Sequence, residues 1–176
     1  MTTVAFGTVK PIPVTAATID WKAYKIAYER WGTIELESGE LDFEEGTLTG
    51  GNFVVDMTSI QVTSLEGKKK ANLEKHLRSD DFFGVEQFPG ATMIITAVEQ
   101  SADGYTVTGD FTIKGQTHPV IFPMTFDGNT AIAKVKIDRS KYNVRYGSDS
   151  FFDNLGDRVI YNLSLIHISE PTRPLT

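Results

Sequence analysis

Apolar and polar residues alternate along most of this chain. From Thr18 onward, the alternating runs are short and are separated by Gly, Asp and Asn, which is typical of antiparallel strands joined by tight turns. The pattern predicts strands at residues 18–26, 32–41, 48–62, 91–100, 105–115, 118–128, 130–140 and 158–166. A turn is expected at Ser38-Gly39. The chain is therefore predicted to be all-β, with about eight strands.

One segment departs from this alternation. Between Thr63 and Leu77, leucines are spaced among charged residues, and Thr63 with Glu66 fits a capping box. We expect a single helix over about 64–77 and assign no element to residues 1–17. Eight antiparallel strands with one helix are typical of a closed barrel or a sandwich.

A closed barrel would turn one parity of each strand inward. The inward sets we predict are rich in large apolar groups: Tyr105, Val107, Phe111 and Ile113; Val120, Phe122, Met124 and Phe126; Ala133, Val135 and Ile137. An eight-stranded barrel can be filled by its own side chains or can hold one small ligand. Gly109, Ala131 and Ala133 leave room inside, so a packed core and a ligand pocket remain equally open.

Composition and charge narrow the possible partners. The 176 residues suit one domain, and the net charge of -6 argues against a nucleic-acid partner. The basic run at Lys68-Lys69-Lys70 is interleaved with Glu66 and Glu74, which favours a solvated helix face over a binding patch. No apolar run approaches the ~18 residues of a membrane span.

Candidate chemistry is sparse. The chain has no cysteine, and its three histidines, His76, His118 and His167, fit no metal-binding spacing. No nucleophile elbow or phosphate loop occurs. We therefore predict a protein that is not an enzyme and needs no cofactor or metal.

Arg139 is the one charged residue predicted to turn inward, because it shares parity with Val135 and Ile137. There it could pair with a buried carboxylate, which we favour, or with the anionic head group of a ligand. With Tyr142 and Tyr146, it is also the only starting point for a catalytic alternative.

Four segments of the chain stand out: VVDMTSIQV (54–62), EKHLRSDDFFGVEQFPGATM (74–93), YTVTGDFTIKGQTHPVIFPMTF (105–126) and KIDRSKYNVRYGSDSFFDNLGDRVIYN (136–162). Together they resemble the YceI-like, polyisoprenoid-binding family of lipocalin-like proteins. The resemblance covers roughly residues 18–162. It implies an eight-stranded antiparallel lipocalin-like barrel with one helix and an apolar tunnel. Such a tunnel would carry or store an isoprenoid or other long-chain lipid.

The resemblance supplies no catalytic residue, so candidate tunnel positions come from strand parity and from the phenylalanines after the helix. They are Trp21, Phe53, Val55, Met57, Phe82, Phe83, Phe111, Ile113, Phe122, Met124, Phe126, Val135 and Ile137. Phe82 and Phe83, with Phe151 and Phe152, could form a lid or a plugged end. A simple core role fits each candidate equally well. The alternative function is a filled β-barrel that acts as an interaction module without a ligand.

The resemblance also bears on location and on the chain ends. Members of this bacterial family are commonly periplasmic, but residues 1–17 lack the features of a signal peptide, so a cytoplasmic location stays open. SLIHISEPTR (164–173) resembles a translated sequencing adapter. We therefore expect the native barrel domain to span 18–163 and residues 164–176 to be a non-native tail. A homodimer is left open.

Overall fold

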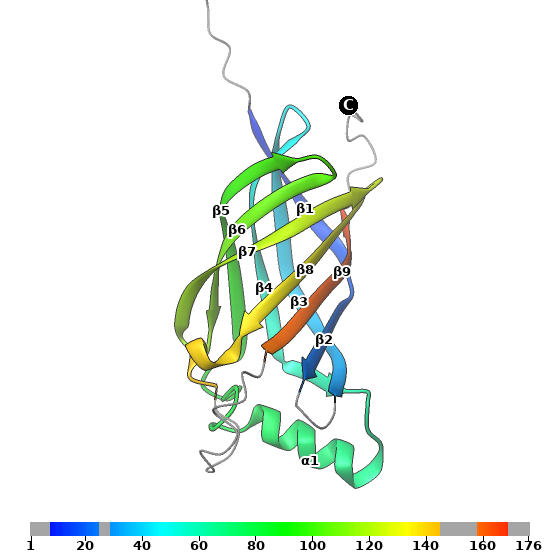
Figure 1. The fold of residues 1–176 in the computed structure, drawn as a ribbon, viewed down its shortest axis with the longest axis vertical. Helices are drawn as coiled ribbons and strands as arrows, with labels where there is room; N and C mark the ends of the chain where they lie inside the picture. The colour runs from blue at the N-terminus through cyan, green and yellow to red at the C-terminus, as the bar shows by residue number, and fades with distance from the viewer. Residues whose placement is uncertain (1–7, 25–28, 145–157, 169–176) are drawn as a thin grey trace, which may run out of the picture.

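Nine strands form one antiparallel sheet in the computed structural model, which describes residues 8–24, 29–144 and 158–168. The strands are β1 (Val9–Ala17), β2 (Ile19–Tyr24), β3 (Glu29–Glu44), β4 (Thr47–Val62), β5 (Gly90–Ser101), β6 (Gly104–Ile113), β7 (Gln116–Asp127), β8 (Thr130–Asp138) and β9 (Arg158–Ile168). Helix α1 (Gly67–Arg78) lies across one end of the sheet, and a 3-10 turn, η1 (Arg139–Tyr142), follows β8 (Figure 1).

The sheet closes into a barrel because β3 pairs with both β2 and β4. The strand order is β1-β3-β2-β9-β8-β7-β6-β5-β4, with additional β3–β4 and β1–β9 pairings. Strands β1 and β2 follow each other across Thr18 and both pair with β3 and β9, so together they occupy one place in the wall. The barrel thus has eight places, and the predicted fold class is confirmed. Closure satisfies the strand edges that an open sheet would expose.

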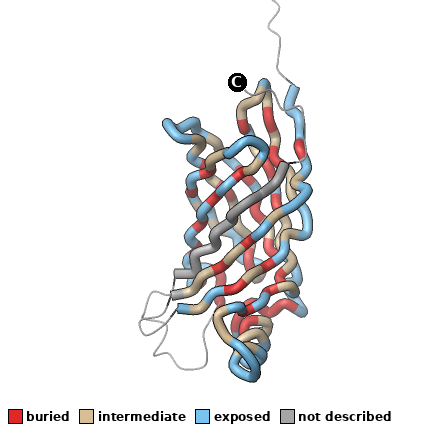
Figure 2. The backbone as a smooth tube through the Cα atoms, turned by 90° about the vertical axis from the view of Figure 1, so that its right-hand side faces the viewer, coloured by how far each residue is buried: buried red, intermediate tan, exposed pale blue. Residues whose placement is uncertain are grey.

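Burial alternates along the strands as the period-2 pattern predicts (Figure 2). In β8, Ala131, Ala133, Val135 and Ile137 are buried, whereas the residues between them are exposed. The inward sets predicted for β6 and β7 are likewise buried or half-buried. The core therefore lies inside the barrel.

The predicted turn at Ser38-Gly39 is wrong. Strand β3 runs through it with a bulge between Leu36 and Ser38, and the hairpin to β4 turns at Glu45–Gly46, where φ is 50° and 79°. Two consecutive positive φ values are typical of a tight hairpin. Gly39 instead packs against the Phe53 ring.

Strand β1 lies within residues 1–17, for which the sequence predicts no element. Pro11 and Pro13 interrupt its alternation, and proline is tolerated only where no ladder donor is needed. Both are exposed, whereas Ile12 between them is buried. The two prolines break the alternating pattern, so the sequence did not predict this strand, although it contributes to the core.

Helix α1 begins three residues later than expected, and the predicted capping box is wrong. Its N-cap is Glu66, with no side-chain cap hydrogen bond. The backbone N–H groups of Thr63 and Ser64 donate to the Trp31 carbonyl, at 3.0 and 3.2 Å. These bonds hold residues 63–64 against the start of β3, so the helix starts only afterwards. Its last turn carries Lys75, His76 and Arg78, as suits a helix C-terminus.

Helix α1 replaces a strand partner for the end of β4. Pairing between β4 and β5 stops at Asp56–Gly90. Beyond that point, the Met57 N–H donates to the Pro89 carbonyl at 2.8 Å. The Arg78 guanidinium donates to the Ile60 carbonyl at 2.7 Å, and the Val62 N–H donates to the Glu74 carboxylate at 3.1 Å. Side chains of the helix thus satisfy a strand edge that would otherwise be open.

Candidate ligand-binding cavity

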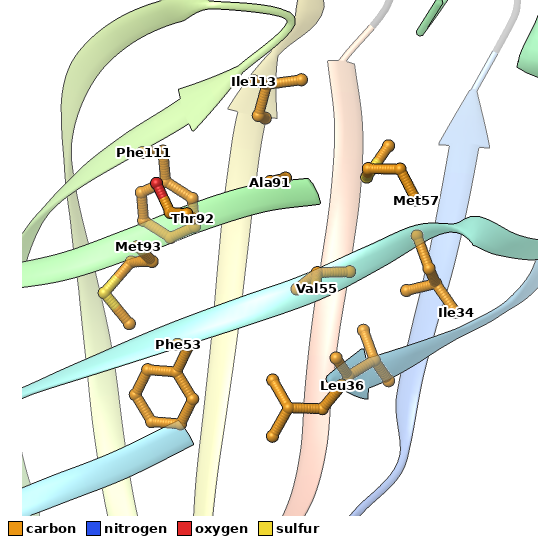
Figure 3. Close-up of a pocket in the computed structure, with 11 residues that line it drawn as sticks. Ile34, Leu36, Phe53, Val55, Met57, Ala91, Thr92, Met93, Phe111 and Ile113 are labelled. Carbon is orange, nitrogen blue, oxygen red and sulfur yellow. The ribbon is translucent and has the colours of Figure 1, made fainter. Parts of the chain in front are cut away.

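A cavity of about 60 Å³ lies inside the barrel. Five neighbouring strands, β2 to β6, supply its lining: Ile19, Ile34, Leu36, Phe53, Val55, Met57, Ala91, Thr92, Met93, Phe111 and Ile113. Figure 3 shows Phe53, Met93 and Phe111 on one side and Ile34, Leu36 and Met57 on the other. The side chains that line the cavity therefore all come from β-strands.

Two glycines allow large side chains to lie close to the backbone of the barrel wall, which leaves space inside the barrel. Gly39 is the cross-strand partner of Phe53, and a Cβ there would lie 2.6 Å from the Phe53 ring. A Cβ on Gly109 would lie 2.8 Å from the Met93 sulfur. Such distances are too short for real contacts, so only glycine lets Phe53 and Met93 occupy these positions.

The lining is almost entirely apolar. Ten of the eleven side chains are apolar, the exception is Thr92, and none is ionisable. Leu36, Val55, Thr92 and Phe111 are only partly buried and thus keep surface that a ligand could contact. An apolar cavity has too few polar partners to hold ordered water and favours apolar occupants. It can therefore bind hydrocarbon by burial but offers no group for acid–base chemistry.

The cavity brings together five of the thirteen tunnel candidates: Phe53, Val55, Met57, Phe111 and Ile113. Trp21, Phe122, Met124, Val135 and Ile137 are buried but do not line this cavity.

Three further candidates lie away from the cavity. Phe126 packs edge-on against Phe43 and Tyr105, with ring centroids 5.9 and 5.8 Å away. Phe82 and Phe83 are buried just after α1, with ring centroids 4.7 Å apart.

Phe151, Phe152 and Tyr146 fall outside the described residues. Their predicted roles stay predictions.

Six lining residues were not among the candidates: Ile19, Ile34, Leu36, Ala91, Thr92 and Met93. Alternation placed most of them on strands, so their parity could have been assigned. For Ile34 and Leu36, the signal was obscured by the expected turn at Ser38-Gly39. Thr92 is polar and adjacent to inward residues, so no periodic pattern indicates its contact with the cavity.

Arg139 is buried, at 7% exposure, and begins the turn η1 rather than continuing strand β8. Its guanidinium donates to the Val144 carbonyl at 2.8 Å, which holds the turn after β8. The nearby Tyr142 ring packs edge-on to His118, with centroids 5.1 Å apart. Burial, with smaller contributions from the charges of Asp138 and Asp110, raises the pKa of Tyr142 to about 12.

Within the residues that the structure describes, no three His, Asp or Glu side chains gather as metal ligands would. No helix in that part of the chain is long and apolar enough to cross a membrane.

Residues 9–165 match the family described as YceI-like domain. The chain belongs to this family. Among curated YceI-like relatives, the UPF0312 protein plu2095 of Photorhabdus laumondii is 34% identical over 111 residues, which are 62% of this chain and 56% of that protein. The chain thus spans little more than half the length of the curated relatives it matches.

Solved YceI-like structures share the fold. BcnA of Burkholderia cenocepacia superposes with a TM-score of 0.69 at 22% identity, covering 85% of this chain and 94% of that one. A domain from Saccharophagus degradans, described as polyisoprenoid-binding and implicated in plant cell wall breakdown, gives a TM-score of 0.53 at 11% identity. That match covers 89% of this chain and 99% of the domain. At these identities, the likeness concerns the fold alone.

Proposed function

We propose that this protein binds a long-chain apolar ligand, an isoprenoid or other lipid, inside its barrel and carries or stores it. The observation that carries the proposal is a cavity lined by ten apolar side chains and Thr92. Burying hydrocarbon gains about 0.8 kcal/mol per CH₂, so a chain can be held without a charged anchor. The polyisoprenoid-binding description of a structural neighbour supports the same ligand class.

The size of the cavity favours a ligand that displaces side chains as it enters. A single water molecule needs about 10–15 Å³ of cavity volume. A cavity of about 60 Å³ therefore accommodates only a short segment of a ligand's hydrocarbon chain. Longer chains require rearrangement of the half-buried lining residues, Leu36 and Val55 among them. The same small volume also fits a second candidate function, in which the barrel is filled by its own side chains and acts as an interaction module.

Native mass spectrometry of the purified protein, followed by organic extraction, tests the proposal directly. We expect a co-purifying lipid, or loading by added isoprenoid alcohols and fatty acids. Affinity should rise about fourfold per CH₂ until the available space is filled, as about 0.8 kcal/mol each implies. Failure to find or load any long-chain ligand would favour the filled barrel.

A matched pair of substitutions localises the ligand. Val55→Phe projects added volume into the cavity, whereas Val54→Phe alters the opposite face of β4. Excluding two or three CH₂ groups would weaken binding roughly 30-fold, or about 2 kcal/mol. Val54→Phe should bind as the parent protein does. Equal affinities of the two variants, measured by fluorescent-lipid titration, would place the ligand elsewhere.

A further inference from the structure

The apolar cavity ends at a row of inward side chains on three neighbouring strands. Phe53 on β4 pairs with Met93 on β5, which pairs in turn with Phe111 on β6, so the three side chains are direct cross-strand neighbours. On each strand, the member of this row is the lining residue farthest from the end that α1 covers. Figure 3 shows all three on one side of the cavity. The row therefore separates the cavity from the half of the barrel that lies away from α1.

Beyond this row, the barrel is filled by its own side chains. Leu41, Val107 and Met124 are each 1% exposed or less, and none of them lines the cavity. The side chains close tightly over Gly51, where a Cβ would lie 3.0 Å from Leu41 Cδ2 and 3.3 Å from Ile95 Cδ1. An apolar chain inside the cavity thus meets the row and finds packed side chains behind it.

The opposite side of the cavity has the less continuous wall. Pairing between β4 and β5 stops at Asp56–Gly90, and the adjoining residues Met57 and Ala91 both line the cavity. Past this point, the edge of β4 is held by the Pro89 carbonyl and by side chains of α1. A hydrocarbon chain that enters on this side would point its tip toward the row.

Met93 is the central and most adaptable member of the row. Phe111 on one side of it is packed edge-on against Phe122, with ring centroids 6.0 Å apart. Methionine, by contrast, is unbranched and flexible and fills irregular space. Its position depends on Gly109, because a Cβ there would lie 2.8 Å from Met93 Sδ and 3.2 Å from Met93 Cγ. The glycine thus allows Met93 to lie back against β6 and out of the cavity.

We infer that Met93 sets the greatest length of hydrocarbon chain that the cavity accepts. The inference rests on the proposed binding of an apolar chain and adds which residue meets the tip of that chain. Each added CH₂ strengthens binding only while there is space to bury it, and the space ends at Met93. A shorter side chain at this position should admit longer chains. A side chain at Gly109 should push Met93 into the cavity and admit only shorter ones.

A homologous series of unbranched fatty acids, each longer by one CH₂, tests the inference by displacement of a fluorescent fatty acid. In the parent protein, affinity should rise about fourfold with each CH₂ and then level off at a limiting length. Met93→Ala removes Cγ, Sδ and Cε and should move the limit to longer chains. A chain two CH₂ groups beyond the parental limit should then bind roughly 15-fold more tightly to Met93→Ala than to the parent. Gly109→Ala should move the limit the other way, weakening a chain of the parental limiting length at least about fourfold.

Two matched variants serve as controls. Met124→Ala removes the same atoms from the packed half of the barrel, and Gly90→Ala adds a Cβ that meets nothing closer than 3.7 Å. Both should keep the parental limit. If Met93→Ala does not fold, Gly109→Ala, which retains the methionine, decides the question.

The outcomes separate this inference from the proposed function. One limiting length shared by the parent, Met93→Ala and Gly109→Ala, with chains still bound, overturns the role of Met93 and leaves lipid binding standing. A limit that moves as far in Met124→Ala as in Met93→Ala also overturns it, because the stop would then lie in the packed half. If the parent binds no chain of any length, the inference and the proposed function both fail.

Discussion

The Tyr142 hydroxyl is buried without a hydrogen-bond partner among the described residues. A buried polar group left unpaired costs about 1–3 kcal/mol. Tyr142→Phe is therefore expected to raise the free energy of unfolding by about 1 kcal/mol. Tyr105→Phe is the matched control and should lower the free energy of unfolding, because the Tyr105 hydroxyl accepts a hydrogen bond from the Leu48 N–H at 3.3 Å. Urea denaturation of both variants checks the prediction, and a destabilised Tyr142→Phe would contradict it.

The same tyrosine predicts a pH dependence at the alkaline end. Its pKa is about 12 in the folded protein against an ordinary value of 10. Between pH 10 and 12, the folded state keeps a proton that the unfolded state releases, so stability falls as pH rises through this window. The loss of stability is absent below pH 10 and reaches at most about 3 kcal/mol above pH 12. Tyr142→Phe should lose stability less steeply there; parallel curves for the two proteins would refute the assignment.

Gly39 links stability to the cavity. A Cβ at this position must displace the Phe53 ring, and the open direction is toward the cavity. Gly39→Ala should cost about 1–3 kcal/mol in unfolding free energy, as overpacking does, and should weaken lipid binding. Gly90→Ala is the control, since its Cβ would meet nothing closer than 3.7 Å. If Gly39→Ala matched Gly90→Ala in both measurements, Phe53 would not depend on this glycine.

At the scale of elements, α1 is expected to stabilise the end of β4 through Glu74. Glu74→Ala leaves the Val62 N–H without its acceptor and should cost about 1–2 kcal/mol, whereas Glu74→Gln retains an acceptor oxygen. Hydrogen exchange at the Val62 amide should accelerate in Glu74→Ala only. Lys75→Ala, an exposed change on the same helix, controls for helix propensity. Unchanged exchange at Val62 in Glu74→Ala would show that the side chain does not protect this edge.

Element types were predictable from the sequence, whereas several boundaries were not. Alternation is a local property, so strands from β2 to β9 could be located and their inward faces assigned in β6, β7 and β8. The start of α1 depends on bonds between residues 63–64 and Trp31, which lie far apart in sequence. The proline-interrupted β1 is a strand because β3 and β9 pair with it.

The cavity was less predictable for a related reason. Phe53 and Phe122 share the inward parity, yet Phe53 lines the cavity and Phe122 does not. Whether an inward side chain fills the core or lines the cavity depends on the residue beside it on the neighbouring strand, such as Gly39 opposite Phe53 or Gly109 near Met93. Period-2 patterns carry no information about these cross-strand partners. The ligand class followed from the family resemblance rather than from periodicity.

At the scale of the whole molecule, β9 completes the wall between β8 and the β1–β2 pair. Its residues 166–168 pair with Val14–Ala17, and 166–167 also pair with Thr130–Ala131. Removing residues 164–176 should therefore lower the melting temperature and speed hydrogen exchange in Val14–Ala17. Removing only 169–176 deletes none of these pairings and serves as the control. Equal melting temperatures of the two truncations would show that this part of β9 does not stabilise the barrel.

The end of β4 is bonded to side chains of α1 instead of to strand β5, and this also has a mechanical consequence. From Asn52 to Asp56, β4 is joined to β5 by a ladder of backbone hydrogen bonds. Beyond Met57, the described joints are the Pro89 contact and two bonds to side chains of α1. A force that pulls β4 away from β5 should therefore rupture this stretch before the paired stretch from Asn52 to Asp56. Because Met57 lines the cavity, the weaker part of the joint between β4 and β5 runs beside the space proposed for the ligand.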